Sequence, residues 1–261
     1  MADTVETPVE STTLSDHIVS LRLNRPATRN AINNEMLHLL ASNVRDAEAN
    51  GHIRCIILTG GPDFFSAGSD IKEMRAAGIS AIQNRTRMES WAVLETTRIP
   101  MIAAVSGICL GGGHELAMLC DVVVASESAK IGQPEIKLGH IPGDGATQRL
   151  RRIAGKYAAM QMILTGEPID ATAALSLGLV SEVVAQDQCE NRAREIAELI
   201  ARHSAKALGL AKDAVRAADE LPLSAGLERE RRNIALAFTT RDQKEGLAAF
   251  FEKRSPDFWD E

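Results

Sequence analysis

Short apolar runs rich in β-branched residues alternate with amphipathic segments along the first 145 residues of the chain. The runs at 53–59, 101–105 and 122–125 are too short for helices, and the first two are followed by glycines. The segment 17–23 alternates apolar and polar residues, as a half-buried strand does. Between these strands, apolar residues recur every three or four positions over 36–47, which predicts a helix. Strands that alternate with helices favour an α/β fold with a parallel sheet.

After residue 145 strand-like runs nearly vanish, except at 180–185. Before that residue we also expect helices from 69 or 70 to 74, at 79–97 and at 112–120. After it we expect helices at 146–154, 156–164, 171–176, 187–202, 204–219, 224–239 and 241–252. We therefore predict three parts: a loose polar tail over 1–14, an α/β core over 15–195 and a helical C-terminal region over 196–261. Because the last region is amphipathic but only lightly apolar, we expect it to pack on the α/β body, on a neighbouring subunit or on both.

Composition excludes several classes of protein. With 261 residues, 45% of them apolar, the chain is long enough to bury a core. Its net charge of −6 argues against a general nucleic-acid binder. No apolar run approaches the roughly 18 residues of a membrane span. The four cysteines are scattered without metal-ligand spacing, so we predict reduced thiols and no metal site. The N-terminal segment is acidic, unlike a secretory or mitochondrial signal, so we predict a cytoplasmic location.

Three consecutive glycines, Gly111–Gly113, stand between an apolar strand and an apolar-faced helix. Glycine lets a ligand approach the backbone closely, and the free N–H groups at a helix start carry partial positive charge. Such groups can stabilise a developing oxyanion. The alternative interpretation is a tight turn in which glycine serves packing alone.

Two other loops combine small residues with acids. The segment FSAGSDI at 65–71 runs from a loop into a short helix, and GQPE at 132–135 precedes IPGDG at 141–145. By composition alone, Glu135 is a solvated loop carboxylate and Glu115 a partner of its helix dipole.

The order and spacing of these motifs resemble the enoyl-CoA hydratase (crotonase) superfamily. The segments that carry the resemblance are FFSAGSDIKEM, GICLGGGHELAMLCDVVVAS and GQPEIKLGHIPGDGATQRL, with LNRPATRNAIN at 23–33, LTGEPIDATAALSLGLVSEVV at 164–184 and EGLAAFFEKRSPDF at 245–258. The resemblance spans residues 15–260 and is strongest to the enoyl-CoA hydratases. It implies a spiral of ββα units with a helical C-terminal region, assembled as a homotrimer or homohexamer.

The resemblance also implies roles for individual residues. The backbone N–H groups of Ser69 and Gly112 match the oxyanion hole that binds the thioester oxygen. Glu115 and Glu135 match the two catalytic glutamates. A pair of carboxyls that shares one proton can activate water and protonate C2. By analogy Glu115 is favoured as the base and Glu135 as the proton donor, although the sequence leaves that division open.

Residues that match contacts with CoA are more dispersed. The backbone at Ala67, with neighbouring Asp70 and Ile71, matches the segment that binds CoA. Lys253 matches a basic residue that reaches the CoA phosphates from a neighbouring subunit, and Arg25 resembles another basic position near CoA. A solvated surface charge is the alternative interpretation of Lys253.

Two residues depart from the hydratase pattern. Asp144 stands where most hydratases have a small apolar residue. The β-diketone hydrolases of the superfamily resemble this chain in having an aspartate at that position, but they tend to carry His in place of Glu135. The alternative for Asp144 is a turn or N-cap residue of the next helix. His114 precedes Glu115, and we interpret it as a partly buried neutral histidine, with modulation of the pH profile as the alternative. Gly143 stands where the related dienoyl isomerases have aspartate, so the sequence departs from that subtype.

The predicted activity is the reversible syn addition of water to a trans-2-enoyl-CoA, which gives a 3-hydroxyacyl-CoA. CoA is part of the substrate, and no metal, flavin or nicotinamide is implied. One alternative is a carbon–carbon bond hydrolase, or another acyl-CoA lyase or isomerase, of the same superfamily. A further alternative is a non-catalytic member that binds acyl-CoA. The sequence does not predict the acyl chain.

Overall fold

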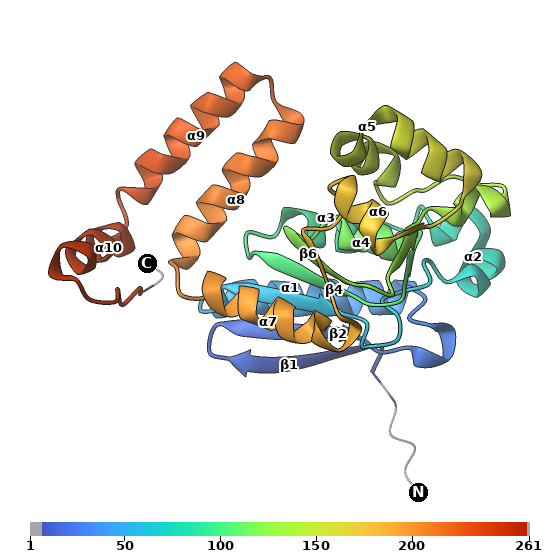
Figure 1. Cartoon of the computed structure of the whole chain (residues 1–261), viewed down its shortest axis with the longest axis horizontal. Coiled ribbons are helices and arrows are strands. Elements are labelled where there is room, and N and C mark those ends of the chain that lie inside the picture. The colour runs from blue at the N-terminus through green and yellow to red at the C-terminus, as the bar shows by residue number, and fades with distance from the viewer. Residues whose placement is uncertain (1–6, 260–261) are drawn as a thin grey trace, which may run out of the picture.

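The computed structural model describes residues 7–259 and is built around a six-stranded sheet (Figure 1). Its strand order is β1-β2-β3-β4-β6-β9. The strands are β1 (Val9–Ser15), β2 (Ile18–Leu23), β3 (Cys55–Thr59), β4 (Met101–Val105), β6 (Val122–Ser126) and β9 (Glu182–Val184). Only β1 pairs antiparallel, with β2, whereas the other neighbouring pairs are parallel. The predicted α/β organisation is therefore confirmed.

Ten α-helices occur within residues 7–259. They are α1 (Asn34–Asn50), α2 (Ile71–Ala77), α3 (Arg85–Thr96), α4 (Gly112–Ala117), α5 (Ala146–Thr165), α6 (Ala171–Ser176), α7 (Cys189–Ile200), α8 (Ala205–Glu220), α9 (Leu223–Ala237) and α10 (Arg241–Glu252). Short 3-10 helices are η1 (Pro26–Thr28), η2 (Gly78–Ala81), η3 (Pro134–Leu138) and η4 (Gln186–Gln188). The α5 backbone is kinked at Gly155, where the sequence predicts two helices.

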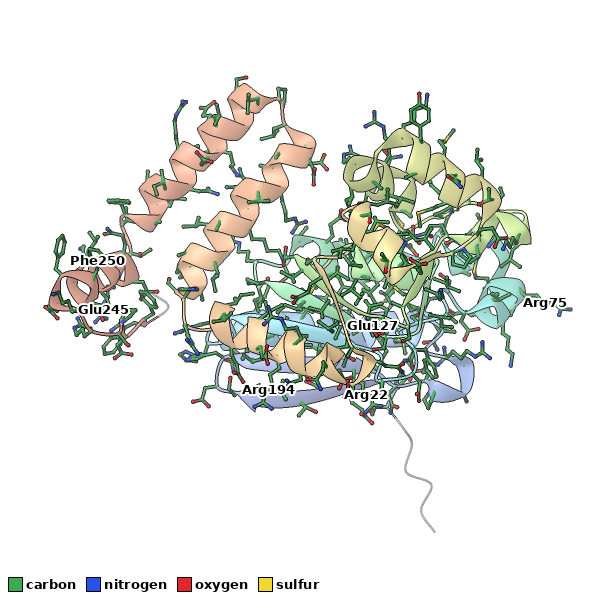
Figure 2. The ribbon with its side chains drawn as sticks, viewed as in Figure 1. Arg22, Arg75, Glu127, Arg194, Glu245 and Phe250 are labelled. Atoms are coloured by element: carbon green, nitrogen blue, oxygen red, sulfur yellow. The ribbon has the colours of Figure 1, made fainter. Side chains whose placement is uncertain are left out.

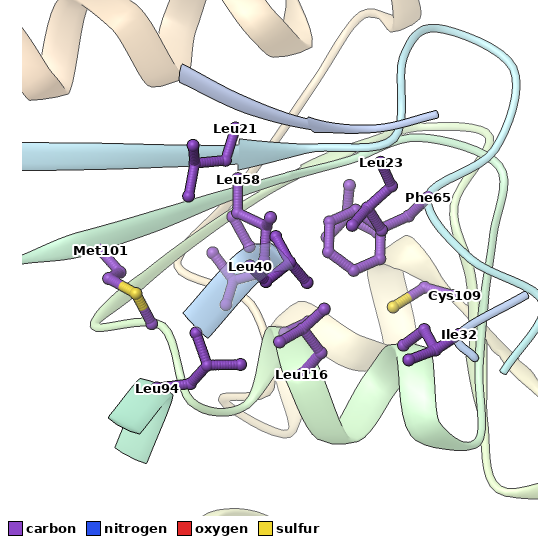
Figure 3. Close-up of a cluster of buried hydrophobic side chains, with 14 of the residues drawn as sticks. Leu21, Leu23, Ile32, Leu40, Leu58, Phe65, Leu94, Met101, Cys109 and Leu116 are labelled. Atoms are coloured by element: carbon purple, nitrogen blue, oxygen red, sulfur yellow. The ribbon is translucent and has the colours of Figure 1, made fainter. Parts of the chain in front are cut away.

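Successive residues of the central strands face opposite sides of the sheet, so each side has its own apolar core. Leu58 and Met101 belong to the larger core, which the helices α1, α3 and α4 cover (Figure 3). Ile57 and Ile102 face the other way and pack against the small residues of α7. Because both sides of the sheet are covered, β3 and β4 are buried at every position, which explains their unbroken apolar runs.

A second sheet was not predicted from the sequence. It has the order β5-β7-β8 and consists of β5 (Ile108–Leu110), β7 (Lys130–Gly132) and β8 (Ile169–Asp170). Each strand has at most three residues, which is too short to show a periodic pattern. The sheet matters for function because β5 leads into α4 and β7 leads into η3.

Two predicted boundaries are wrong. Residues 9–14, expected in the loose tail, form most of β1; the expected tail residues 1–6 lie outside the described part of the chain. Only Val9 of this edge strand is buried, so no apolar alternation marks it. The expected boundary at 195 falls inside α7, which packs on the sheet and belongs to the core.

The helices α8–α10 extend from the body as an arm (Figure 1). Its base is held by Lys212 of α8, whose ammonium lies 2.7 Å from Asp121 and donates to the carbonyl of Ile99 at 2.9 Å. Among residues 7–259, no helix combines the length and the apolar character that crossing a bilayer requires.

Candidate active site

The small sheet brings two glutamates from separate motifs to one pocket. In the parallel pairing of β5 with β7, Leu110 lies opposite Gly132, and the Gly111 N–H donates to the Gly132 carbonyl at 2.9 Å. The chain then turns from β5 into α4, which carries Glu115, and from β7 into η3, which carries Glu135. Both glutamates line a pocket with Ile32, Ser69, Asp70, Glu73, Met74, Ala81, Ile82, Arg87, His140, Ile141, Gly143 and Asp144.

Glu115 is 2% exposed, and its carboxylate is held by the backbone at the start of α5. Its Oε1 atom accepts the N–H groups of Asp144 at 2.9 Å and Ala146 at 2.8 Å. Burial raises the pKa of Glu115 to about 7; the charges of Asp144 and Glu135 act in the same direction, while the backbone N–H groups oppose the shift. A carboxyl with such a pKa can gain and lose a proton near neutral pH.

Glu135 is 8% exposed, so the compositional expectation of a solvated carboxylate is wrong. Burial raises its pKa, and the charge of Asp144 adds to the shift. The side chain lies against the glycine turn: a Cβ atom added to Gly111 would come within 2.8 Å of Glu135 Oε1. The glycine at this position therefore makes room for the second carboxyl.

The backbone nitrogen of Ser69, in the loop before α2, lies close to Gly112 at the start of α4. A Cβ atom placed on Gly112 would approach Ser69 Oγ to 2.8 Å and Ser69 N to 3.4 Å. Gly112 is the first residue of α4, so its N–H has no acceptor within the helix. Within residues 7–259, neither N–H donates to another backbone group. The pair can therefore donate to a ligand oxygen.

Asp144 forms a buried ion pair with Arg87 of α3. Their side chains are 12% and 7% exposed. The interpretation of Asp144 as a helix N-cap is wrong, because α5 is preceded by Gly145 and has no side-chain cap. Sequence reasoning missed Arg87: nothing in the pattern of α3 distinguishes it from surface arginines.

His114 is 2% exposed, and burial lowers its pKa to about 4. It is therefore a neutral histidine, as expected, although more deeply buried. Its Nδ1 atom lies 3.0 Å from the side-chain amide of Gln133, which separates it from Glu135. Gln133 was also missed, and its place beside a motif glutamate is the only signal that the sequence offers.

Four of the candidate CoA contacts lie near Ser69: Ala67, Asp70 and Ile71 along the same segment, and Arg25 through its ion pair with Asp70. Asp70 caps α2 by accepting the N–H of Lys72 at 3.0 Å, and it pairs with Arg25 at 2.9 Å. Burial opposes ionisation of Asp70, but the hydrogen bond and charge of Arg25 and the backbone donors keep its pKa below the ordinary value. Ala67 is half-buried and Ile71 is exposed, both next to the Ser69 turn.

Lys253 does not join the pocket. It is exposed, with a φ of 56° at the end of α10, and α10 lies at the opposite end of the molecule from α2 (Figure 1). A single chain therefore brings together the two glutamates, Ser69, Asp70 and Asp144, but leaves Lys253 apart.

Comparisons with known proteins identify the family of the chain. The family model described as enoyl-CoA hydratase/isomerase matches residues 13–261. The 2,3-dehydroadipyl-CoA hydratase of Escherichia coli (strain K12) is 47% identical over 92% of this chain and 94% of its own length. The mitochondrial enoyl-CoA hydratase of Pongo abelii is 41% identical over 92% of this chain and 83% of its own. A crystal structure of enoyl-CoA hydratase from Bacillus anthracis superposes with a TM-score of 0.89 at 38% identity, covering 97% of this chain and 100% of that one.

The mixed α/β fold places two glutamates in one pocket beside two backbone N–H groups that have no backbone acceptor within residues 7–259, and the comparisons specify the family. The chain belongs to the enoyl-CoA hydratase/isomerase family. Its crotonase-like fold is confirmed, and it is most similar to the hydratases of that family, as the motifs indicated.

Proposed function

We propose that this protein is an enoyl-CoA hydratase that adds water reversibly to a trans-2-enoyl-CoA. The observation that carries the proposal is the burial of Glu115 and Glu135 in one pocket, beside the N–H groups of Ser69 and Gly112, which have no backbone acceptor within residues 7–259. Two carboxyls can hold and activate one water, while two N–H donors can stabilise charge on a thioester oxygen.

In the proposed hydration, the thioester oxygen accepts hydrogen bonds from Ser69 and Gly112. Glu115, as the base, takes a proton from water while the water oxygen bonds to C3. The π electrons move toward the thioester oxygen, and C2 then takes a proton from Glu135. Glu115 ends protonated and Glu135 ionised, so exchange of one proton with solvent restores the enzyme. These steps use proton transfer alone, and we propose that no metal or redox cofactor takes part.

The CoA part of the substrate would bind along the loop that contains Ala67, Asp70 and Ile71. Arg25 supports this loop through its ion pair with Asp70, so its contribution to CoA binding would be largely indirect. The acyl part would enter the pocket, whose walls combine apolar side chains with the Arg87–Asp144 ion pair. Because the E. coli relative is named for 2,3-dehydroadipyl-CoA, that dicarboxylic substrate belongs in any specificity test.

Asp144 raised the alternative of a carbon–carbon bond hydrolase. The structure commits its carboxylate to Arg87 and its backbone N–H to Glu115. Both contacts serve the architecture around Glu115, and Glu135 is a glutamate rather than the histidine of those hydrolases. We therefore favour hydration, with Asp144 as a supporting residue.

We also propose assembly into a homotrimer or homohexamer through the arm. Large apolar side chains remain exposed on it, among them Val215, Leu223, Phe238, Phe250 and Phe251. Figure 2 shows Phe250 on α10, far from the body of the same chain. Lys253 of one subunit would reach the CoA phosphates bound to another. The four cysteines form no disulfide, which supports a reducing, cytoplasmic location.

The decisive experiment compares substrates by kcat/KM. The panel contains crotonyl-CoA, longer and branched enoyl-CoAs, 2,3-dehydroadipyl-CoA and a β-diketone, and hydration is followed by the loss of the conjugated thioester's ultraviolet absorbance. We expect turnover of enoyl-CoAs that survives dialysis against a chelator, with one solvent deuteron incorporated at C2. Cleavage of the β-diketone without hydration of any enoyl-CoA would overturn the proposal.

A further inference from the structure

The side-chain amide of Gln133 lies between a buried histidine and a buried glutamate. With its nitrogen toward Glu135, Gln133 donates to Oε1 at 2.9 Å and Oε2 at 3.2 Å, and its oxygen accepts from His114 Nδ1 at 3.0 Å. In the opposite orientation the nitrogen lies 3.0 Å from His114 Nδ1, and the amide oxygen faces the Glu135 carboxylate. That arrangement brings two acceptors together when Glu135 is ionised.

The other ring nitrogen of His114 distinguishes these orientations. Nε2 is buried, and no hydrogen-bond partner for it exists within residues 7–259. A hydrogen on Nε2 would be a buried donor without an acceptor, which folded proteins rarely contain. Burial keeps the ring neutral, so its single hydrogen belongs on Nδ1. From there it reaches the oxygen of Gln133, and the amide nitrogen must then face Glu135.

We propose that His114 is a positioning residue: its Nδ1–H locks the Gln133 amide so that the amide donates to Glu135 and stabilises the carboxylate that remains after proton transfer to C2. The inference rests on the proposed role of Glu135 as proton donor. It assigns His114, a departure from the usual hydratase motif, an indirect part in the reaction. His114 itself touches neither water nor substrate in this scheme.

Other ionisable groups also lie near Glu135. His140 follows η3, Asp144 precedes α5 and pairs with Arg87 of α3, and Glu115 lies on α4. None of them contacts the Nδ1 atom of His114, so variants at His114 leave these charges in place. A change in the titration of Glu135 can then be traced to the Gln133 amide.

Two substitutions separate hydrogen bonding from packing. His114→Asn places an amide nitrogen where Nδ1 stands, whereas His114→Leu fills similar volume without a donor. Dehydration of a 3-hydroxyacyl-CoA is the informative direction, because ionised Glu135 must take the C2 proton. We expect His114→Leu to lower kcat about tenfold at neutral pH, the scale of one orienting hydrogen bond. KM should change little, and the acid limb of the profile should move to higher pH. His114→Asn should restore both within about threefold.

A double-mutant comparison tests the path through the amide. Gln133→Met should shift the acid limb by itself, and adding His114→Leu should cause no further shift. Additive shifts would overturn the proposal. So would a His114→Leu enzyme with the parent kcat and pH profile, whether or not its melting temperature falls. Full activity of Glu135→Gln would instead refute the proposed proton donor, which distinguishes the two failures.

The tautomer can also be measured in the unmodified enzyme. Nitrogen NMR of protein labelled in its histidines, with the His114→Asn spectrum for assignment, reports which ring nitrogen carries hydrogen. We expect the Nδ1–H form. Observation of the Nε2–H form would overturn the proposal even if the variants failed to fold.

Discussion

Arg87 and Asp144 form a buried ion pair that joins α3 to the start of α5, directly beside Glu115. The backbone N–H of Asp144 donates to the Glu115 carboxylate at 2.9 Å, so the ion pair also fixes the segment that orients this glutamate. The positive charge of Arg87 offsets that of Asp144, one of the five carboxylates that line the pocket.

Removal of Arg87 alone should be strongly destabilising. In Arg87→Met, Asp144 stays buried without its cation, and we expect the free energy of unfolding to fall by about 3 kcal/mol or more. The double variant Arg87→Met/Asp144→Leu should recover most of that loss, because no isolated charge remains. Urea unfolding measures the loss in the single variant and its recovery in the double variant. Equal stability of Arg87→Met and the parent would contradict a stabilising role for the ion pair.

Folding stability should depend on the titration of Glu115. Burial raises its pKa from 4.5 to about 7 in the folded state, so the native protein binds this proton more tightly than the unfolded chain. Its contribution to the free energy of unfolding is therefore present at low pH and is lost as pH rises from about 4.5 to about 7. The full difference is about 3 kcal/mol. In Glu115→Gln this component should disappear, and unfolding of both proteins across that pH range would show whether it does.

Single replacement of either glutamate should abolish efficient turnover. We expect Glu115→Gln and Glu135→Gln each to lower kcat by about 10²–10⁴, the scale of a positioned acid or base. The amide preserves shape, so CoA-thioester binding should survive and can be measured by calorimetry. Near-normal hydration by both variants would eliminate the mechanism with two carboxyls.

The oxyanion hole makes opposite predictions for its two residues. Ser69→Ala retains the N–H and should have a mild effect. Gly112→Val should reduce kcat severely, because its Cβ would come within 2.8 Å of Ser69 Oγ and obstruct the thioester oxygen. Circular dichroism should confirm that both variants fold. A folded Gly112→Val enzyme with normal kcat would be incompatible with this site.

Lys253 tests the link between assembly and CoA binding. Lys253→Ala should raise KM for CoA thioesters and leave kcat nearly unchanged, because the phosphates lie far from the double bond. The difference in KM should shrink at high salt, which screens exposed charges. Sedimentation should show a trimer or hexamer. A fully active monomer, or unchanged KM at low salt, would refute the proposed contact.

Much of the architecture could be predicted because its signals are local. The apolar runs of β3 and β4 are buried on both sides, and the stripe of α1 matches one face of the core. The polar edge strand β1 was missed because most of its side chains face solvent. The strands β5, β7 and β8 were missed because they are too short for periodicity.

The motifs by themselves predicted the class of fold and singled out the two glutamates as candidate catalytic residues, since glycine turns and carboxyls are local features of the chain. Only the tertiary structure decided their environment. Arg87 meets Asp144 across 57 positions of sequence, and Gln133 lies between His114 and Glu135 through the pairing of β5 with β7. Ionisation depends on burial and on neighbouring charges, and neither exists until distant segments have packed together.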